Sequence, residues 1–179
     1  IASSLVGSEM CIRDRVRREI ALSLRDLPAE KTKDIFIELA KRCDTTDKNS
    51  LEAIGLGAAK QESIIWRAIK DELHLDSSDK WNDHFARLTW RLWGAASVND
   101  LKARITNNSL SLEKRKFALE SLAFIDDKLA SNTMLEIASK PSQLKGQAVA
   151  WLLRNAAGEW AKHGAVSYTH LRAHETTSD

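Results

Sequence analysis

Apolar residues recur along this chain at intervals of three and four, the spacing that places side chains on one face of an α-helix. Residues 16–27 place Ile20, Leu24 and Leu27 on such a face, and residues 29–43 continue the pattern with Ile35 and Leu39. No window shows the strict alternation of a half-buried strand. The pattern predicts about nine helices, over residues 16–27, 29–43, 49–58, 60–75, 80–93, 97–107, 111–125, 128–139 and 142–156.

Alternate predicted helices begin near residues 16, 48, 80, 112 and 142, which is a step of about 30–32 residues. A short sequence match has the same period: Phe85-Ala86 stands 32 residues before Phe117-Ala118. A step of this size, made of two antiparallel helices, is typical of an α-solenoid, in which neighbouring units share one core. The sequence therefore predicts an all-α fold, an α-α superhelix of antiparallel helices in pairs.

Local signals refine the helix ends. Asn49 stands three residues before Glu52, and Ser97 three before Asp100, which is the spacing of an N-terminal capping box. We expect each pair to start a helix.

Two glycines, Gly55 and Gly57, lie inside a predicted helix, where each costs roughly 1 kcal/mol relative to alanine. No strand precedes them, so a phosphate-binding glycine loop has little support. We interpret them as positions where another helix approaches closely.

Composition narrows the function classes only slightly. The chain has 179 residues, with 27 Lys and Arg against 25 Asp and Glu, so its formal charge is only +2. This balance does not indicate a nucleic-acid or membrane-surface protein. No apolar run approaches the roughly 18 residues that span a bilayer, so we expect no membrane span.

Both ends of the chain resemble translated sequencing-adapter read-through, which recurs at the ends of reading frames predicted from metagenomic assemblies. The matching strings are SLVGSEMCIRDR (4–15) and VSYTHLRAHET (166–176). We expect residues 1–15 and 166–179 to be artefactual or disordered tails around a fragment, 16–165. This interpretation also removes His170 and His174, whose spacing of four would otherwise suggest a metal site near His163.

No constellation of residues predicts catalysis, a cofactor or a metal. The sequence contains no GxSxG, P-loop or HExxH motif. His74, His84 and His163 have no partner at ligand spacing, and we expect them at the surface or at helix ends. Cys43 falls on an apolar helix flank, where a small core residue is the simpler interpretation than a nucleophile. We therefore expect a segment that is not itself an enzyme.

The six tryptophans suggest a surface for a partner, although core packing is the simpler role for most of them. Trp90 and Trp93 cannot easily both point inward beside Leu88 and Leu92, so we expect at least one to be exposed. Several basic residues follow nearby, but acidic residues interleave with them, which favours a solvated mixed-charge face over a nucleic-acid groove. The candidate interaction surface consists of Arg87, Trp90, Arg91, Trp93, Lys114 and Arg115.

The helical pairs resemble HEAT repeats of the armadillo-type superfamily. A narrower resemblance, covering nearly all of 16–165, is to the helical segment of large bacterial membrane-bound dehydrogenase-like proteins. It runs through RREIALSLRDLPAEKTKDIFIELAKRC, NSLEAIGLGAA, WNDHFARLTWRLW, KRKFALESLAFI and AVAWLLRNAAGEWAKHG.

In those proteins a propeller precedes the segment and a c-type cytochrome domain follows it. The resemblance implies a non-catalytic scaffold, a protein partner and a periplasmic or membrane-associated parent. The chain has no CxxCH haem motif, so no haem or dehydrogenase residue carries over. The alternative is a HEAT-like protein that binds nucleic acid in a basic groove, as a DNA-repair glycosylase would.

Overall fold

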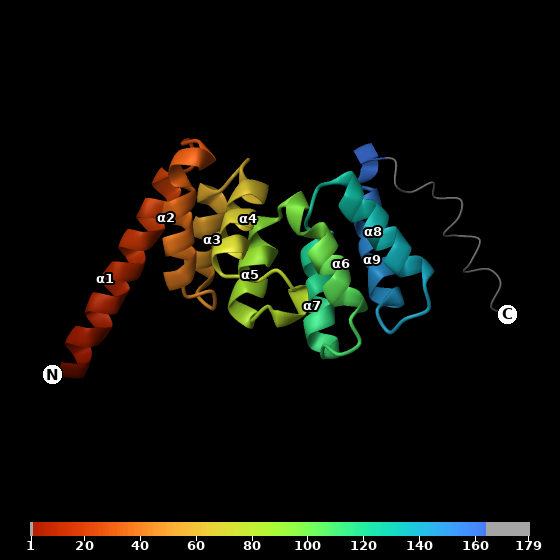
Figure 1. Ribbon diagram of the computed structural model, residues 1–179, viewed down its shortest axis with the longest axis horizontal. Coiled ribbons are helices and arrows are strands. Elements are labelled where there is room, and N and C mark those ends of the chain that lie inside the picture. The colour runs from red at the N-terminus through yellow and green to blue at the C-terminus, as the bar shows by residue number, and fades with distance from the viewer. Residues whose placement is uncertain (1, 164–179) are drawn as a thin grey trace.

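The computed structural model describes residues 2–163, with side chains from residue 12 onward. The expected C-terminal tail, 166–179, lies outside these residues. The described chain is all helical and has no strand, which confirms the all-α prediction (Figure 1). Its nine α-helices are α1 (Ala2–Ser23), α2 (Ala29–Arg42), α3 (Lys48–Gly57), α4 (Glu62–Glu72), α5 (Asp83–Leu92), α6 (Val98–Thr106), α7 (Leu112–Ala123), α8 (Lys128–Ser139) and α9 (Lys145–Ala156). Three short 3-10 helices accompany them: η1 (Ser78–Lys80), η2 (Ala95–Ser97) and η3 (Ala161–His163).

The helices form two layers, in which most helices contact the next member of their own layer; across the layers α6 packs extensively on α7, and α8 on α9. The odd-numbered helices form one layer, and the even-numbered helices form the other, with η2 between α4 and α6. Figure 1 shows the helices following one another in chain order from the N-terminal to the C-terminal end. In the odd layer α3, α5, α7 and α9 begin at residues 48, 83, 112 and 145, in steps of 35, 29 and 33.

Neighbouring helices of the odd layer run in the same direction. At the N-terminal ends of α5 and α7, Lys114 Nζ lies 3.7 Å from Asp83 Oδ1. At their C-terminal ends, the rings of Trp93 and Phe124 lie 6.0 Å apart. The odd layer therefore has two distinct edges, one formed by N-terminal and one by C-terminal helix ends.

Helix α1 differs from the sequence prediction in its start and in its buried face. It begins at Ala2 and continues without a break across the boundary expected between residues 15 and 16. It buries Ala21 and Leu24, whereas Ile20 and Leu27 are exposed, so the predicted stripe is wrong at these two positions. The reason is that α3 packs against the side of α1 that carries Ala21. Ile35 of α2 is likewise exposed instead of buried.

Neither predicted capping box forms. Asp47 is the N-cap of α3, and its side chain accepts a hydrogen bond from the Asn49 backbone N–H at 3.2 Å. Ser97 precedes α6 without capping it, because its hydroxyl donates to the Gly94 carbonyl oxygen at 2.8 Å. In both cases a competing local hydrogen bond engages a group that the capping box would use: the backbone N–H of Asn49 in the first and the hydroxyl of Ser97 in the second.

The centre of the core is an aromatic contact between α4 and α5. Trp66, Trp81 and Phe85 are almost completely buried, and the Trp81 and Phe85 rings meet edge to face at 4.9 Å. The indole N–H of Trp66 donates to Thr89 Oγ1 at 2.9 Å, which satisfies a polar group that would otherwise be costly to bury. This contact is one of several by which the even layer packs on the odd layer.

Three ion pairs link successive helices of the even layer, and each lysine reaches a carboxylate about one helical pair farther along the chain. The pairs are Lys41–Glu72 at 2.7 Å, Lys70–Asp100 at 2.9 Å and Lys102–Glu136 at 2.5 Å. Such solvent-exposed pairs add little to stability, because water and salt screen them. They favour one register between neighbouring helices.

Both glycines of α3 lie at close helix contacts, as the sequence analysis inferred. A Cβ added to Gly57 would overlap the backbone carbonyl oxygen of Ala21 in α1. A Cβ added to Gly55 would overlap the guanidinium of Arg91 in α5. The two positions therefore let α3 approach its neighbours on both sides.

We predict that Gly57→Ala lowers the free energy of unfolding by about 1–3 kcal/mol, because backbone atoms of α1 must move to admit the methyl group. Urea unfolding followed by circular dichroism measures this change. The control is Gly146→Ala in α9, where an added Cβ meets no atom within 4 Å. Helix propensity alone should then raise the stability by up to about 1 kcal/mol. An equal gain at both positions would show that α1 and α3 do not pack this closely.

Candidate functional site

The structure divides the candidate interaction surface between the two edges of the odd layer. One group lies at the C-terminal end of α5 and the other in the first turn of α7, which starts at the opposite edge. The first group is Trp90, Arg91 and Trp93, and the second is Lys114 and Arg115. Arg87 lies between them on α5 and is half-buried.

Most of the candidate cations already have partners inside the protein. Arg91 is only 5% exposed and donates from Nε to Glu52 at 2.8 Å. Arg115 is 9% exposed and donates from Nε to a backbone carbonyl of α6 at 2.8 Å. Lys114 lies near Asp83. These residues therefore do not build a continuous basic groove.

The first group extends into an aromatic cluster that consists of Trp90, Trp93, Phe124 and Trp151. Phe124 is its centre, with ring centroids 5.9 Å from Trp90, 6.0 Å from Trp93 and 5.7 Å from Trp151. The four residues come from α5, the end of α7 and α9, so the cluster crosses three successive helices of the odd layer. Only the tertiary structure brings Phe124 and Trp151 beside Trp93.

Trp93 is the exposed member of the cluster, which confirms that one of the two neighbouring tryptophans faces outward. Its side chain is 40% exposed, while Trp90 is half-buried. Trp93 ends α5 in the left-handed region, with φ 48° and ψ 21°. A bulky residue there costs on the order of 1–3 kcal/mol, so surrounding contacts must hold it. The Arg91 guanidinium, 4.5 Å from the Trp93 ring centroid, provides one of them.

The cluster also contains one unsatisfied polar atom. Trp90 Nε1 is buried and has no hydrogen-bond acceptor among the described residues. A buried donor without an acceptor costs about 1–3 kcal/mol, and such exceptions in a native structure call for an explanation.

The histidines make structural contacts. His84 Nε2 lies 2.8 Å from the carbonyl oxygen of Ala40, and His163 Nε2 lies 2.8 Å from Asp126. Within residues 12–163 no three His, Cys, Asp or Glu side chains gather as metal ligands would. His170 and His174 lie outside the described residues.

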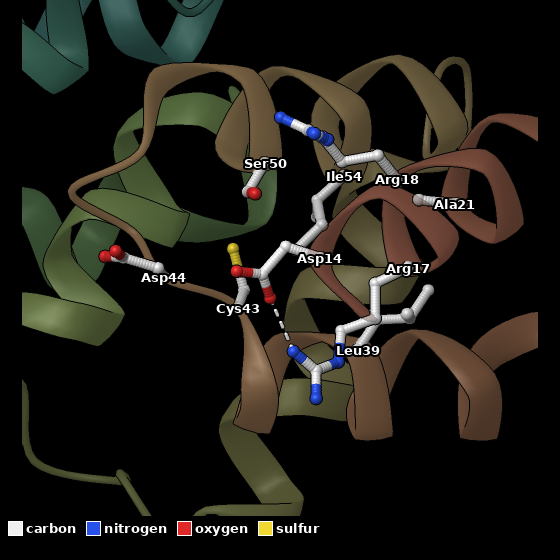
Figure 2. A pocket seen from close by; sticks show the side chains of 9 residues that line it. All are labelled: Asp14, Arg17, Arg18, Ala21, Leu39, Cys43, Asp44, Ser50 and Ile54. Carbon is white, nitrogen blue, oxygen red and sulfur yellow. Dashed lines mark hydrogen bonds and ion pairs between the residues drawn. The ribbon is translucent and has the colours of Figure 1, made fainter. Parts of the chain in front are cut away.

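Cys43 lines a small pocket between α1, α2 and α3, together with the ion pair of Asp14 and Arg17 (Figure 2). The cavity volume is only about 10 Å³, which is room for about one water molecule. Burial raises the pKa of the Cys43 thiol to about 12, and the charges of Asp44 and Asp47 add to this effect. The thiol is therefore protonated at neutral pH and is a poor nucleophile.

No protein-family model, curated protein or solved structure matches the chain. Among the described helices, none combines the length and the apolar character that crossing a bilayer requires. The family resemblance, the adapter origin of the tails and the domain boundaries stay predictions.

We predict that Cys43 reacts at least about tenfold more slowly with Ellman's reagent in the native protein than in urea at pH 8, because its raised pKa and burial suppress the thiolate. The measurement uses a Cys11→Ser background, so that Cys43 is the only thiol. The same chain with Cys43→Ser serves as the blank. Equal rates in native and unfolded protein would contradict the half-buried position of Cys43.

Proposed function

We propose that the chain is a non-catalytic α-solenoid segment of the HEAT/armadillo type that serves as a protein-interaction platform. The two-layer packing supports this assignment, because each helix contacts mainly its neighbours along the chain. The steps of 29–35 residues between helices of the odd layer support it too. Stacked units of this kind present extended surfaces for partners.

The observation that carries the interaction role is the aromatic cluster with exposed Trp93. Tryptophan and arginine are enriched among the residues that dominate binding energy at protein interfaces. Here the Arg91 guanidinium lies 4.5 Å from the centroid of the Trp93 ring, and this ring stacks on Phe124 at an interplanar angle of 17°. A second arginine, Arg154, lies 5.0 Å from the Trp151 ring. A rigid aromatic surface loses little side-chain entropy on binding, so it favours a protein partner.

We further propose that the parent is a larger bacterial redox protein, periplasmic or membrane-associated, in which this segment holds dehydrogenase-like and cytochrome domains in register. This part of the proposal rests on the sequence resemblance alone.

The nucleic-acid alternative has less support. Binding to nucleic acid needs several cations that converge on phosphates. Arg91 is instead buried with an internal partner, and Lys114 and Lys116 lie 3.7 Å and 3.1 Å from Asp83 and Glu113. We therefore retain protein as the proposed partner.

The test is a selection of peptides from a random displayed library against the immobilised full chain. We expect selected peptides to compete for one site, and Trp93→Ala to weaken their binding by at least about tenfold, as the loss of a hot-spot residue does. Fluorescence polarisation of labelled peptides measures the Kd values.

The matched control is Leu129→Ala, since Leu129 of α8 is similarly exposed but lies outside the aromatic cluster. It should leave the Kd unchanged. Selected peptides that are insensitive to Trp93→Ala would refute the aromatic cluster as the binding site, and a substrate turnover that one substitution abolishes would refute the non-catalytic assignment.

A further inference from the structure

A separate pocket lies at the opposite end of α7 from the aromatic cluster. The loops that join α6 to α7 and α8 to α9 lie on the same edge of the molecule (Figure 1), and both contribute to it. Its volume is about 390 Å³, within the range of roughly 300–1,000 Å³ that small-molecule sites occupy. Its charged and polar lining includes Lys102, Arg115, Glu136, Lys140 and Ser142.

Arg115 brings a preorganised guanidinium to this pocket. Its Nε donates to the carbonyl oxygen of Ile105 at 2.8 Å, at the C-terminal end of α6, and the residue is 91% buried. Its Nη1 and Nη2 atoms make no hydrogen bond within the described chain. These atoms reach solvent, because among the described residues the only fully enclosed side-chain nitrogen or oxygen without a hydrogen-bond partner is Trp90 Nε1. A guanidinium held in this way can bind an oxyanion through two parallel N–H groups.

The two lysines of the pocket share a single carboxylate. Glu136 accepts hydrogen bonds from Lys102 at 2.5 Å and from Lys140 at 2.7 Å. These two bonds lower the pKa of Glu136 to about 2, so it is ionised at neutral pH. With Arg115, the four groups carry three positive charges and one negative charge, a net charge of +2.

The N-terminus of α9 adds a third source of positive potential. This helix begins at Lys145, directly after Leu144, which lines the pocket. It has no side-chain cap and no acidic residue in its first turn. Gly146 in the first turn is exposed, and an added Cβ there would meet no atom within 4 Å. Uncapped N–H groups and the helix dipole favour an anion at such an end.

We propose that this pocket binds the phosphate monoester of a small organic molecule. A phosphate monoester carries about −1.5 to −2 charges at neutral pH, which matches the net charge of +2. Pro141, which is exposed, and the edge of Ile137 provide apolar lining for the organic part of the ligand. The site is separate from the aromatic cluster, so this function does not depend on the proposed protein partner.

The test is a titration of the full chain with phenyl phosphate, followed by ¹⁵N–¹H correlation spectra. We expect saturable shifts of the Arg115 Nε–H signal and of the Gly146 and Gln147 amides, and weaker binding as the salt concentration rises. Phenol, which has the same ring without the phosphate, should not shift these signals. The absence of saturable shifts, or equal shifts with phenol, would overturn the proposal.

Two surface variants sharpen the test without touching Arg115. Glu136→Gln should lower the Kd for phenyl phosphate severalfold, because both lysines lose their internal anion. Lys140→Met should raise the Kd severalfold. Lys48→Met in α3 removes an equal charge at a distant exposed position and should leave the Kd unchanged.

If Glu136→Gln does not lower the Kd for phenyl phosphate, the assignment of this pocket is wrong. Trp93→Ala should retain phenyl phosphate binding in full, so the failure of this proposal can be distinguished from the failure of the proposed peptide site.

Discussion

The buried guanidinium of Arg91 is the interaction on which the exposed aromatic surface depends. It occupies the space that a side chain at position 55 would fill, so it fits only because Gly55 has no Cβ. Its Nε is held by Glu52 of α3, and its flat face supports the ring of Trp93. One side chain thus connects the packing of α3 on α5 to the orientation of the aromatic cluster. Lysine could not replace it, since an ammonium has neither the planar face nor the fork of donors.

Stability in this chain comes from contacts between neighbours rather than from any single helix. The helices described are short, with most between 9 and 14 residues, and isolated helices of that length are marginal in water. Helix α3 packs closely on α1 and α5 at Gly57 and Gly55, whereas α6 packs most extensively on α7, and α8 on α9. Local substitutions should therefore act mainly on the helices that contact the changed residue.

The parallel course of helices within the odd layer gives its two edges different chemistry. C-terminal helix ends gather Trp93 and Phe124, with an exposed ring and an unsatisfied indole N–H nearby. N-terminal ends gather Arg115 and the uncapped start of α9, where the backbone itself carries positive potential. An apolar partner and a phosphorylated small molecule would therefore meet opposite edges, and occupation of one edge leaves the other accessible.

The sequence by itself determined the helices, their number and nearly all of their positions, because the three-and-four spacing of apolar residues is a local property of each segment. It also identified Gly55 and Gly57 as close contacts and the exposure of one of two neighbouring tryptophans. Only the tertiary structure decided which side of α1 is buried, that Arg91 and Arg115 are internal, and that Phe124 joins Trp93 and Trp151. These features depend on which residues some 30 positions apart meet across a layer, and local periodicity does not encode that register.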